Sequence, residues 1–165
     1  MSRWAKTIRT WGIVGRGKAG QAILNFLDNG FMIAITDSAM VNGKKHCDFW
    51  RAGVVEDWEV AEKLVSDGKV RHGLFFAHLA LEKTLKGLIS LRSDALAPRI
   101  HNLIQLAETA GLRPDEDQKD LLAEMNQFNI EGRYPSMRPA EPSIAEAGDY
   151  LRRAREVLAW LIRQF

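Results

Sequence analysis

The chain has 165 residues, of which 46% are hydrophobic, so it can form an ordinary folded domain with a substantial core. Its net charge of +2 argues against a strongly basic nucleic-acid-binding protein, and its one cysteine, Cys47, excludes an intrachain disulfide. The sequence has no apolar run of the roughly 18 residues that a membrane-spanning helix needs, and no signal-peptide pattern. We therefore expect a soluble cytoplasmic protein.

The charge changes sign along the chain. Residues 1–53 contain eight Lys or Arg and three Asp, a net charge of +5, which leaves −3 for residues 54–165. A change of this kind is typical of two regions with different surroundings. We therefore predict a basic N-terminal extension over residues 1–53 and a separate domain over residues 54–165.

The first predicted elements form a strand–helix–strand pattern over residues 11–37. Two short apolar runs, Trp11–Val14 and Phe31–Ile35, are typical of strands, and residues 21–27 between them have helical spacing. The sequence after residue 37 is mixed, and Asn42-Gly43 predicts a turn.

A glycine-rich motif follows the first apolar run and resembles the phosphate-binding turn of a dinucleotide-binding fold. Asp37 follows the second run, where such a fold places its ribose-binding acid. The candidate cofactor-binding residues are Gly15, Gly17, Gly20 and Asp37. However, two strands and one helix cannot bury their own apolar surface, and too few residues follow Asp37 for another crossover. We therefore expect no cofactor and an α/β-like or irregular extension that packs on the following domain or is poorly ordered.

From residue 57 onward the hydrophobic spacing is helical. Helices are predicted over residues 57–66, 69–91, 101–110, 114–129 and 144–162. The longest carries an apolar stripe at steps of three and four residues, made of Leu74, Ala77, Leu81, Leu85 and Leu88. Five helices with short connections predict an all-α, antiparallel up-and-down bundle.

Local signals mark several features of these helices. Gly111 is placed to end one helix, while Ser143 and Glu146 have the spacing of a capping box at the start of the last. Glu82 and Lys86 are four residues apart, and such a pair on an exposed helix contributes only about 0.2–0.5 kcal/mol.

Three segments carry a resemblance to a known family. They are Phe76–Leu88, which contains Ala80-Leu81-Glu82-Lys83-Thr84-Leu85-Lys86, then Arg99–Leu103 with its His-Asn-Leu sequence, and finally Glu131–Pro135 with Arg-Tyr-Pro. Together and in this order they resemble the landmarks of HEPN (higher eukaryotes and prokaryotes nucleotide-binding) domains. The resemblance covers about two thirds of the chain.

This resemblance implies a helical bundle that often forms homodimers. Many small prokaryotic HEPN proteins act with a minimal nucleotidyltransferase, frequently as toxin and antitoxin, and bind nucleotide or RNA. Others are metal-independent ribonucleases that use an Arg and a His separated by four to six residues. Only Arg71 and His78 have that separation here, and they lie in the long helix, away from the usual position of the motif.

The resemblance and the residue types together identify candidate binding residues. They are Lys83, Lys86, His101, Arg133 and Tyr134, whose cationic and aromatic groups suit phosphates and bases. Each also has a structural interpretation: the lysines as a solvated helix face, His101 as a helix-start residue, Tyr134 as packing over the end of the bundle and Arg133 as the partner of a carboxylate. No Cys/His cluster has metal-ligand spacing, so no metal site is predicted.

Overall fold

A computed structural model describes the backbone of residues 32–131 and 141–165, and the side chains of residues 45–129 and 141–165. Every regular element in this part is an α-helix. The helices are α3 (Met32–Ser66), α4 (Val70–Ser93), α5 (Leu103–Thr109), α6 (Glu116–Glu131) and α7 (Ile144–Ile162). The predicted all-α bundle is therefore confirmed. No helix in these residues combines the length and hydropathy required to span a bilayer.

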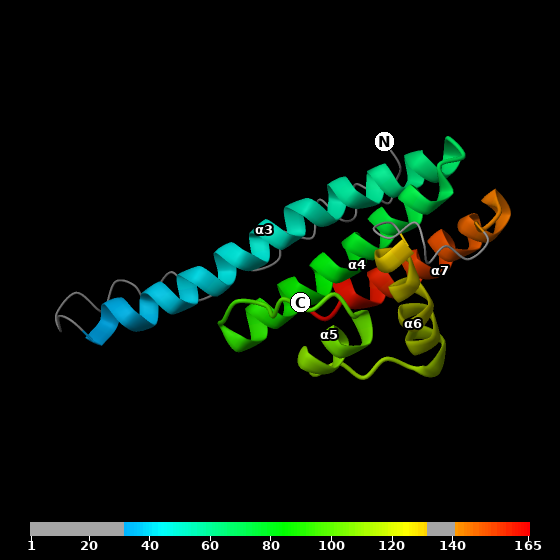
Figure 1. Ribbon diagram of the computed structural model, residues 1–165. Helices are drawn as coiled ribbons and strands as arrows, with labels where there is room; N and C mark the ends of the chain where they lie inside the picture. The colour runs from blue at the N-terminus through cyan, green and yellow to red at the C-terminus, as the bar shows by residue number, and fades with distance from the viewer. Residues whose placement is uncertain (1–31, 132–140) are drawn as a thin grey trace.

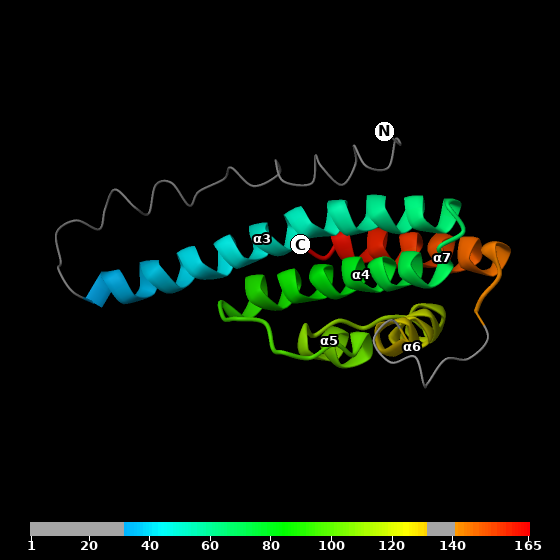
Figure 2. The same ribbon diagram turned by 45° about the horizontal axis from the view of Figure 1, so that its top comes forward.

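Helix α4 is the centre of the bundle and contacts each of the other four helices. The C-terminal part of α3 lies side by side with α4 and α7, and α3 runs antiparallel to both (Figure 1). Helices α5 and α6 cover another side of α4, and α6 runs across the long helices (Figure 2). The N-terminal part of α3 extends well beyond the end of α4.

The core is built from the apolar faces that the sequence predicts. All five residues of the α4 stripe are fully buried. Opposite them lie the buried side chains Trp58 of α3, Met125 and Phe128 of α6, and Leu158 of α7. Burying side chains of this size contributes about 1.5–3 kcal/mol each, so tertiary packing stabilises these helices more than intrinsic propensity does.

Helix α3 is much longer than the sequence predicts. It begins at Met32 and continues through residues 42 and 43, so the predicted strand at Phe31–Ile35 and the predicted turn are wrong. A short apolar run is ambiguous between a strand and a buried helix, and here the helix forms. The helix also crosses residues 53 and 54, where a domain boundary is predicted.

Two glycines end helices in the left-handed conformation that their missing Cβ permits. Gly68 has a φ of 75° and Gly111 a φ of 66°. After Gly111, the N–H of Leu112 donates to the carbonyl of Ala107, and the N–H of Gly111 itself donates to Glu108. This pair of hydrogen bonds is a Schellman motif, which confirms Gly111 as the residue that ends α5.

The capping box at the start of α7 is also confirmed. The backbone N–H of Glu146 donates to Oγ of Ser143 over 3.2 Å, and the N–H of Ser143 donates to Oε2 of Glu146 over 2.8 Å. These two bonds satisfy donors that the first turn of a helix otherwise leaves unpaired.

The Ser143→Ala variant is expected to lower the free energy of unfolding by about 1 kcal/mol, because it removes this cap. Urea denaturation followed by circular dichroism measures the loss. Ser66→Ala, at an exposed position whose hydroxyl bonds only its own helix, is the control and should change stability by less than about 0.5 kcal/mol. Equal losses in the two variants would contradict a specific capping role.

Candidate functional site

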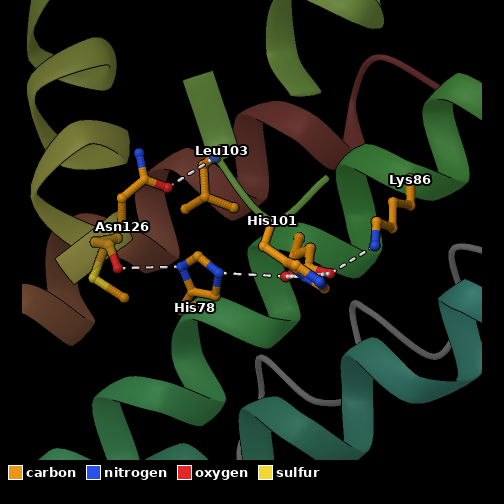
Figure 3. Close-up of polar contacts among 7 residues, drawn as sticks. His78, Lys86, His101, Leu103 and Asn126 are labelled. Atoms are coloured by element: carbon orange, nitrogen blue, oxygen red, sulfur yellow. Dashed lines mark hydrogen bonds and ion pairs between the residues drawn. The ribbon is translucent and has the colours of Figure 1, made fainter. Parts of the chain in front are cut away.

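A buried carboxylate, Glu82, contacts three basic side chains, His78, Lys86 and His101, which Figure 3 labels. Its Oε1 accepts a hydrogen bond from Nζ of Lys86 at 2.8 Å and lies 3.0 Å from Nδ1 of His101. Its Oε2 lies 3.3 Å from Nε2 of His78. We call these four residues the Glu82 cluster. Three of its members are buried, and only His101, whose side chain is 46% exposed, reaches solvent.

Two parts of the chain build the cluster. His78, Glu82 and Lys86 succeed one another at steps of four residues, which places them along one side of α4. His101 comes from the segment that leads into α5. This segment is held firmly, because Asn102 caps α5 through the N–H of Gln105 and the N–H of Leu103 donates to Oδ1 of Asn126 over 2.8 Å.

The proton positions on His78 follow from its neighbours. Nδ1 lies 3.1 Å from the carbonyl oxygen of Met125 on α6, and because a carbonyl only accepts, Nδ1 carries a hydrogen. Nε2 faces the Glu82 carboxylate at ion-pair distance, although in a direction poor for a hydrogen bond. His78 thus links the backbone of α6 to the Glu82 carboxylate of α4.

The surroundings of Glu82 stabilise its charged form. Burial by itself raises the pKa of this carboxyl, but the interactions with His78 and Lys86 and the charge of His101 outweigh that effect. The net result lowers the pKa of Glu82 to about 2. The carboxylate therefore remains ionised over the whole physiological pH range.

Comparison with known proteins identifies the family. The sequence model of the HEPN domain matches residues 48–164, which is well over half of the chain. The chain belongs to the HEPN domain family. The match begins inside α3 and contains the whole Glu82 cluster, so the cluster is part of the HEPN domain itself.

A solved structure agrees with this assignment at the level of the fold. The crystal structure of TT1696 from Thermus thermophilus is 23% identical in sequence and superposes with a TM-score of 0.61. The similarity covers 72% of this chain and 98% of TT1696. No curated protein is significantly similar to the chain in sequence.

Two of the HEPN landmarks meet in the Glu82 cluster. Glu82 and Lys86 belong to the first landmark, and His101 to the second. Sequence reasoning named Lys86 and His101 as candidates but missed Glu82. The available signal was its position beside Leu81 and Leu85, since a charged residue on the margin of a buried stripe needs a partner.

Lys86 and Lys83 are held by different acids. Lys86 is only 7% exposed, so its interpretation as part of a solvated helix face is wrong. It also lies over the ring of Trp50, 5.4 Å from the centroid. Lys83, 26% exposed, places Nζ 2.7 Å from Oδ2 of Asp57 on α3. Gly53 makes room for this lysine, since a Cβ there would lie 2.7 Å from Nζ.

Asp57 differs from Glu82 in the direction of its pKa shift. Burial raises the pKa of Asp57, and the hydrogen bond and charge of Lys83 offset this only in part. Lys83 is therefore paired with a carboxylate that holds its charge less firmly than Glu82 does.

The structure places Arg71 and His78 in separate environments. Two turns of helix, about 10 Å along the axis, lie between them. Nε of Arg71 is 3.8 Å from Oε1 of Glu141, whereas the fully buried ring of His78 contacts Glu82 and the backbone of α6. A substrate phosphate cannot reach His78 in this structure, because the side chain is fully buried. The suggestion that these two residues form a nuclease pair stays a prediction.

The remaining candidate residues fall into two groups. Arg133, Tyr134, Gly15, Gly17 and Gly20 lie outside the described residues. Asp37 lies within α3 and not at the end of a strand, which removes the geometric reason for assigning it to a ribose. The described side chains contain no group of three or more His, Cys, Asp or Glu arranged to hold a metal ion.

Proposed function

We propose that this HEPN protein is a nucleotide- or RNA-binding regulatory module that works with a minimal nucleotidyltransferase in a toxin–antitoxin or stress-response pair. We further propose that it acts in the cytoplasm as a homodimer. The observation that carries the binding proposal is the Glu82 cluster, in which a half-exposed imidazole is anchored on a buried, permanently charged carboxylate. Such an arrangement holds an oriented imidazole at the surface, where a phosphate can reach it.

Further cations lie on α4, the helix that carries Glu82. Lys83 is one turn from Lys86 on α4, and each is already held by a carboxylate. In the proposed function they supply positive potential, while His101 makes the direct contact. Arg133 and Tyr134, which lie outside the described residues, stay proposed as a phosphate contact and a stacking ring on the strength of their residue types alone.

The binding proposal is tested with the full chain and fluorescently labelled single-stranded RNA in a chelating buffer. Fluorescence anisotropy should show binding by the wild type that weakens about tenfold in His101→Ala, corresponding to one lost charge-assisted contact. His72→Ala is a matched control, because His72 is an exposed histidine on α4 outside the cluster. Absence of RNA and nucleotide binding by the wild type would refute the proposal.

The same samples test the alternative function. Cleavage of the RNA in chelator would indicate a metal-independent ribonuclease, and loss of cleavage in Arg71→Ala and His78→Ala would assign it to that pair. Cleavage that survives both substitutions would exclude the pair.

The partner proposal has its own test. The nucleotidyltransferase reading frame nearest to the gene is co-expressed with a tagged form of this protein. Co-purification, together with relief of growth inhibition, supports the pairing. Separate elution of the two proteins on size-exclusion chromatography would count against it.

A further inference from the structure

We infer that Glu82 is a positioning residue that holds the His101 ring with Nε2 free to contact the phosphate of a bound nucleotide. This inference rests on the proposed binding function and makes it more specific, because it assigns the phosphate contact to one nitrogen atom.

The first support is the geometry of the His101 ring. Nδ1 lies 3.0 Å and 3.1 Å from the two oxygens of Glu82, and an ionised carboxylate only accepts hydrogen bonds. Nδ1 therefore carries a hydrogen. Nε2 has no partner among the described residues, and the side chain is nearly half exposed. Neutral His101 thus presents a lone pair at Nε2, and protonated His101 presents an N–H donor there.

The second support is the rigidity of the backbone around His101. Asn102 caps α5, and Leu103 is fully buried, with its N–H bonded to Asn126 of α6. The position of the Cα atom is therefore fixed by two neighbours, and the ring by Glu82. A contact group held in this way loses little conformational entropy when a ligand binds.

The third support is the charge distribution around Glu82. Two basic groups face it from α4, Lys86 and His78, and His101 faces it from the segment before α5. Asp57 of α3 is the neighbouring acid, and α6 contributes the carbonyl of Met125 on the far side of His78. Glu82 is thus surrounded by basic side chains, and His101 is the one of them that reaches solvent.

Competing cations are less suited to a direct phosphate contact. Lys86 is almost fully buried, and Lys83 is engaged with Asp57 at 2.7 Å. A phosphate would have to displace a carboxylate from either lysine. Contact at Nε2 of His101 displaces no described protein group.

The ring state is tested without any ligand by nitrogen NMR on the full chain labelled at histidine, with His101→Gln used to assign the signals. In the wild type, neutral His101 should carry its hydrogen on Nδ1. In Glu82→Gln this preference should be lost, while Glu108→Gln, an exposed change on α5, should leave it intact. A hydrogen on Nε2 in neutral wild-type His101 would overturn the inference, even if Glu82→Gln failed to fold.

The phosphate contact is tested by calorimetry with 5′-AMP and adenosine. The wild type should bind 5′-AMP about tenfold more tightly than adenosine, the gain expected from one charge-assisted contact to the phosphate. Glu82→Gln should lose most of this advantage, and His72→Ala should keep it. RNA or adenosine binding with no advantage for 5′-AMP would overturn this inference alone. Failure of the wild type to bind RNA, 5′-AMP or adenosine would overturn the proposed function.

Discussion

Replacing Glu82 with leucine is expected to lower the free energy of unfolding by about 3–5 kcal/mol, the usual loss when one member of a buried ion pair is removed. The substitution leaves Lys86 and His78 in the core without their shared anion. The cost therefore comes mainly from the desolvated ammonium of Lys86, and it far exceeds the few tenths of a kcal/mol that an exposed pair at this spacing contributes.

Denaturant unfolding of the variant and of two comparison proteins measures this effect. Glu156→Leu removes the acid of an exposed pair four residues from Arg152 on α7, and it should cost less than about 1 kcal/mol. Adding Lys86→Met to Glu82→Leu should recover part of the loss, because the double variant no longer buries that unpaired ammonium. A Glu82→Leu variant as stable as Glu156→Leu would show that the cluster does not stabilise the fold.

The same variant should change the acid sensitivity of the protein. Because the pKa of Glu82 is about 2 in the folded chain and 4.5 is its ordinary value, the stabilisation from its ionisation is fully present above about pH 4.5. It is lost as the pH falls toward 2. The stability difference between wild type and Glu82→Leu should therefore shrink over this window. A constant difference would indicate that folding does not perturb the Glu82 carboxyl.

The parts of the fold that depend on local sequence could be predicted. The α4 stripe requires only helical spacing, and the ends of α5 and α7 require only the chemistry of Gly111 and of Ser143 with Glu146. Each of these signals lies within one or two helical turns. The same local reasoning failed for the start of α3. There a brief apolar run matches both a strand and a helix, and Gly43 lowers helix stability by about 1 kcal/mol without breaking the helix.

The candidate site depends on contacts that local patterns do not encode. The spacing of Glu82 and Lys86 is the same on a solvated helix face as in the core, so spacing alone gave no indication of burial. The partner that completes the cluster, His101, is 19 residues further along the chain. Asp57, which holds Lys83, lies on the preceding helix. Only the packing of the helices brings these groups together.

A second large effect is expected at the contact between α3 and α4, where Gly73→Ala should lower the free energy of unfolding by about 1–3 kcal/mol through overpacking. In a helix interior alanine is more favourable than glycine by about 1 kcal/mol, so helix propensity alone predicts that the substitution raises the free energy of unfolding. The difference arises from packing. A Cβ on Gly73 would lie 2.5 Å from Cγ2 of Val65 and 2.9 Å from the carbonyl oxygen of Ala61.

The matched control is Gly148→Ala on α7, because nothing lies within 4 Å of a Cβ built at Gly148. It should raise the free energy of unfolding by about 0.5–1 kcal/mol. The same change from glycine to alanine is therefore expected to destabilise the protein at residue 73 and to stabilise it at residue 148. Adding Val65→Ala to Gly73→Ala should not restore wild-type stability, because the Ala61 carbonyl belongs to the backbone and cannot turn away. Stabilisation by both glycine substitutions would mean that α3 and α4 are further apart near their connection than the structure places them.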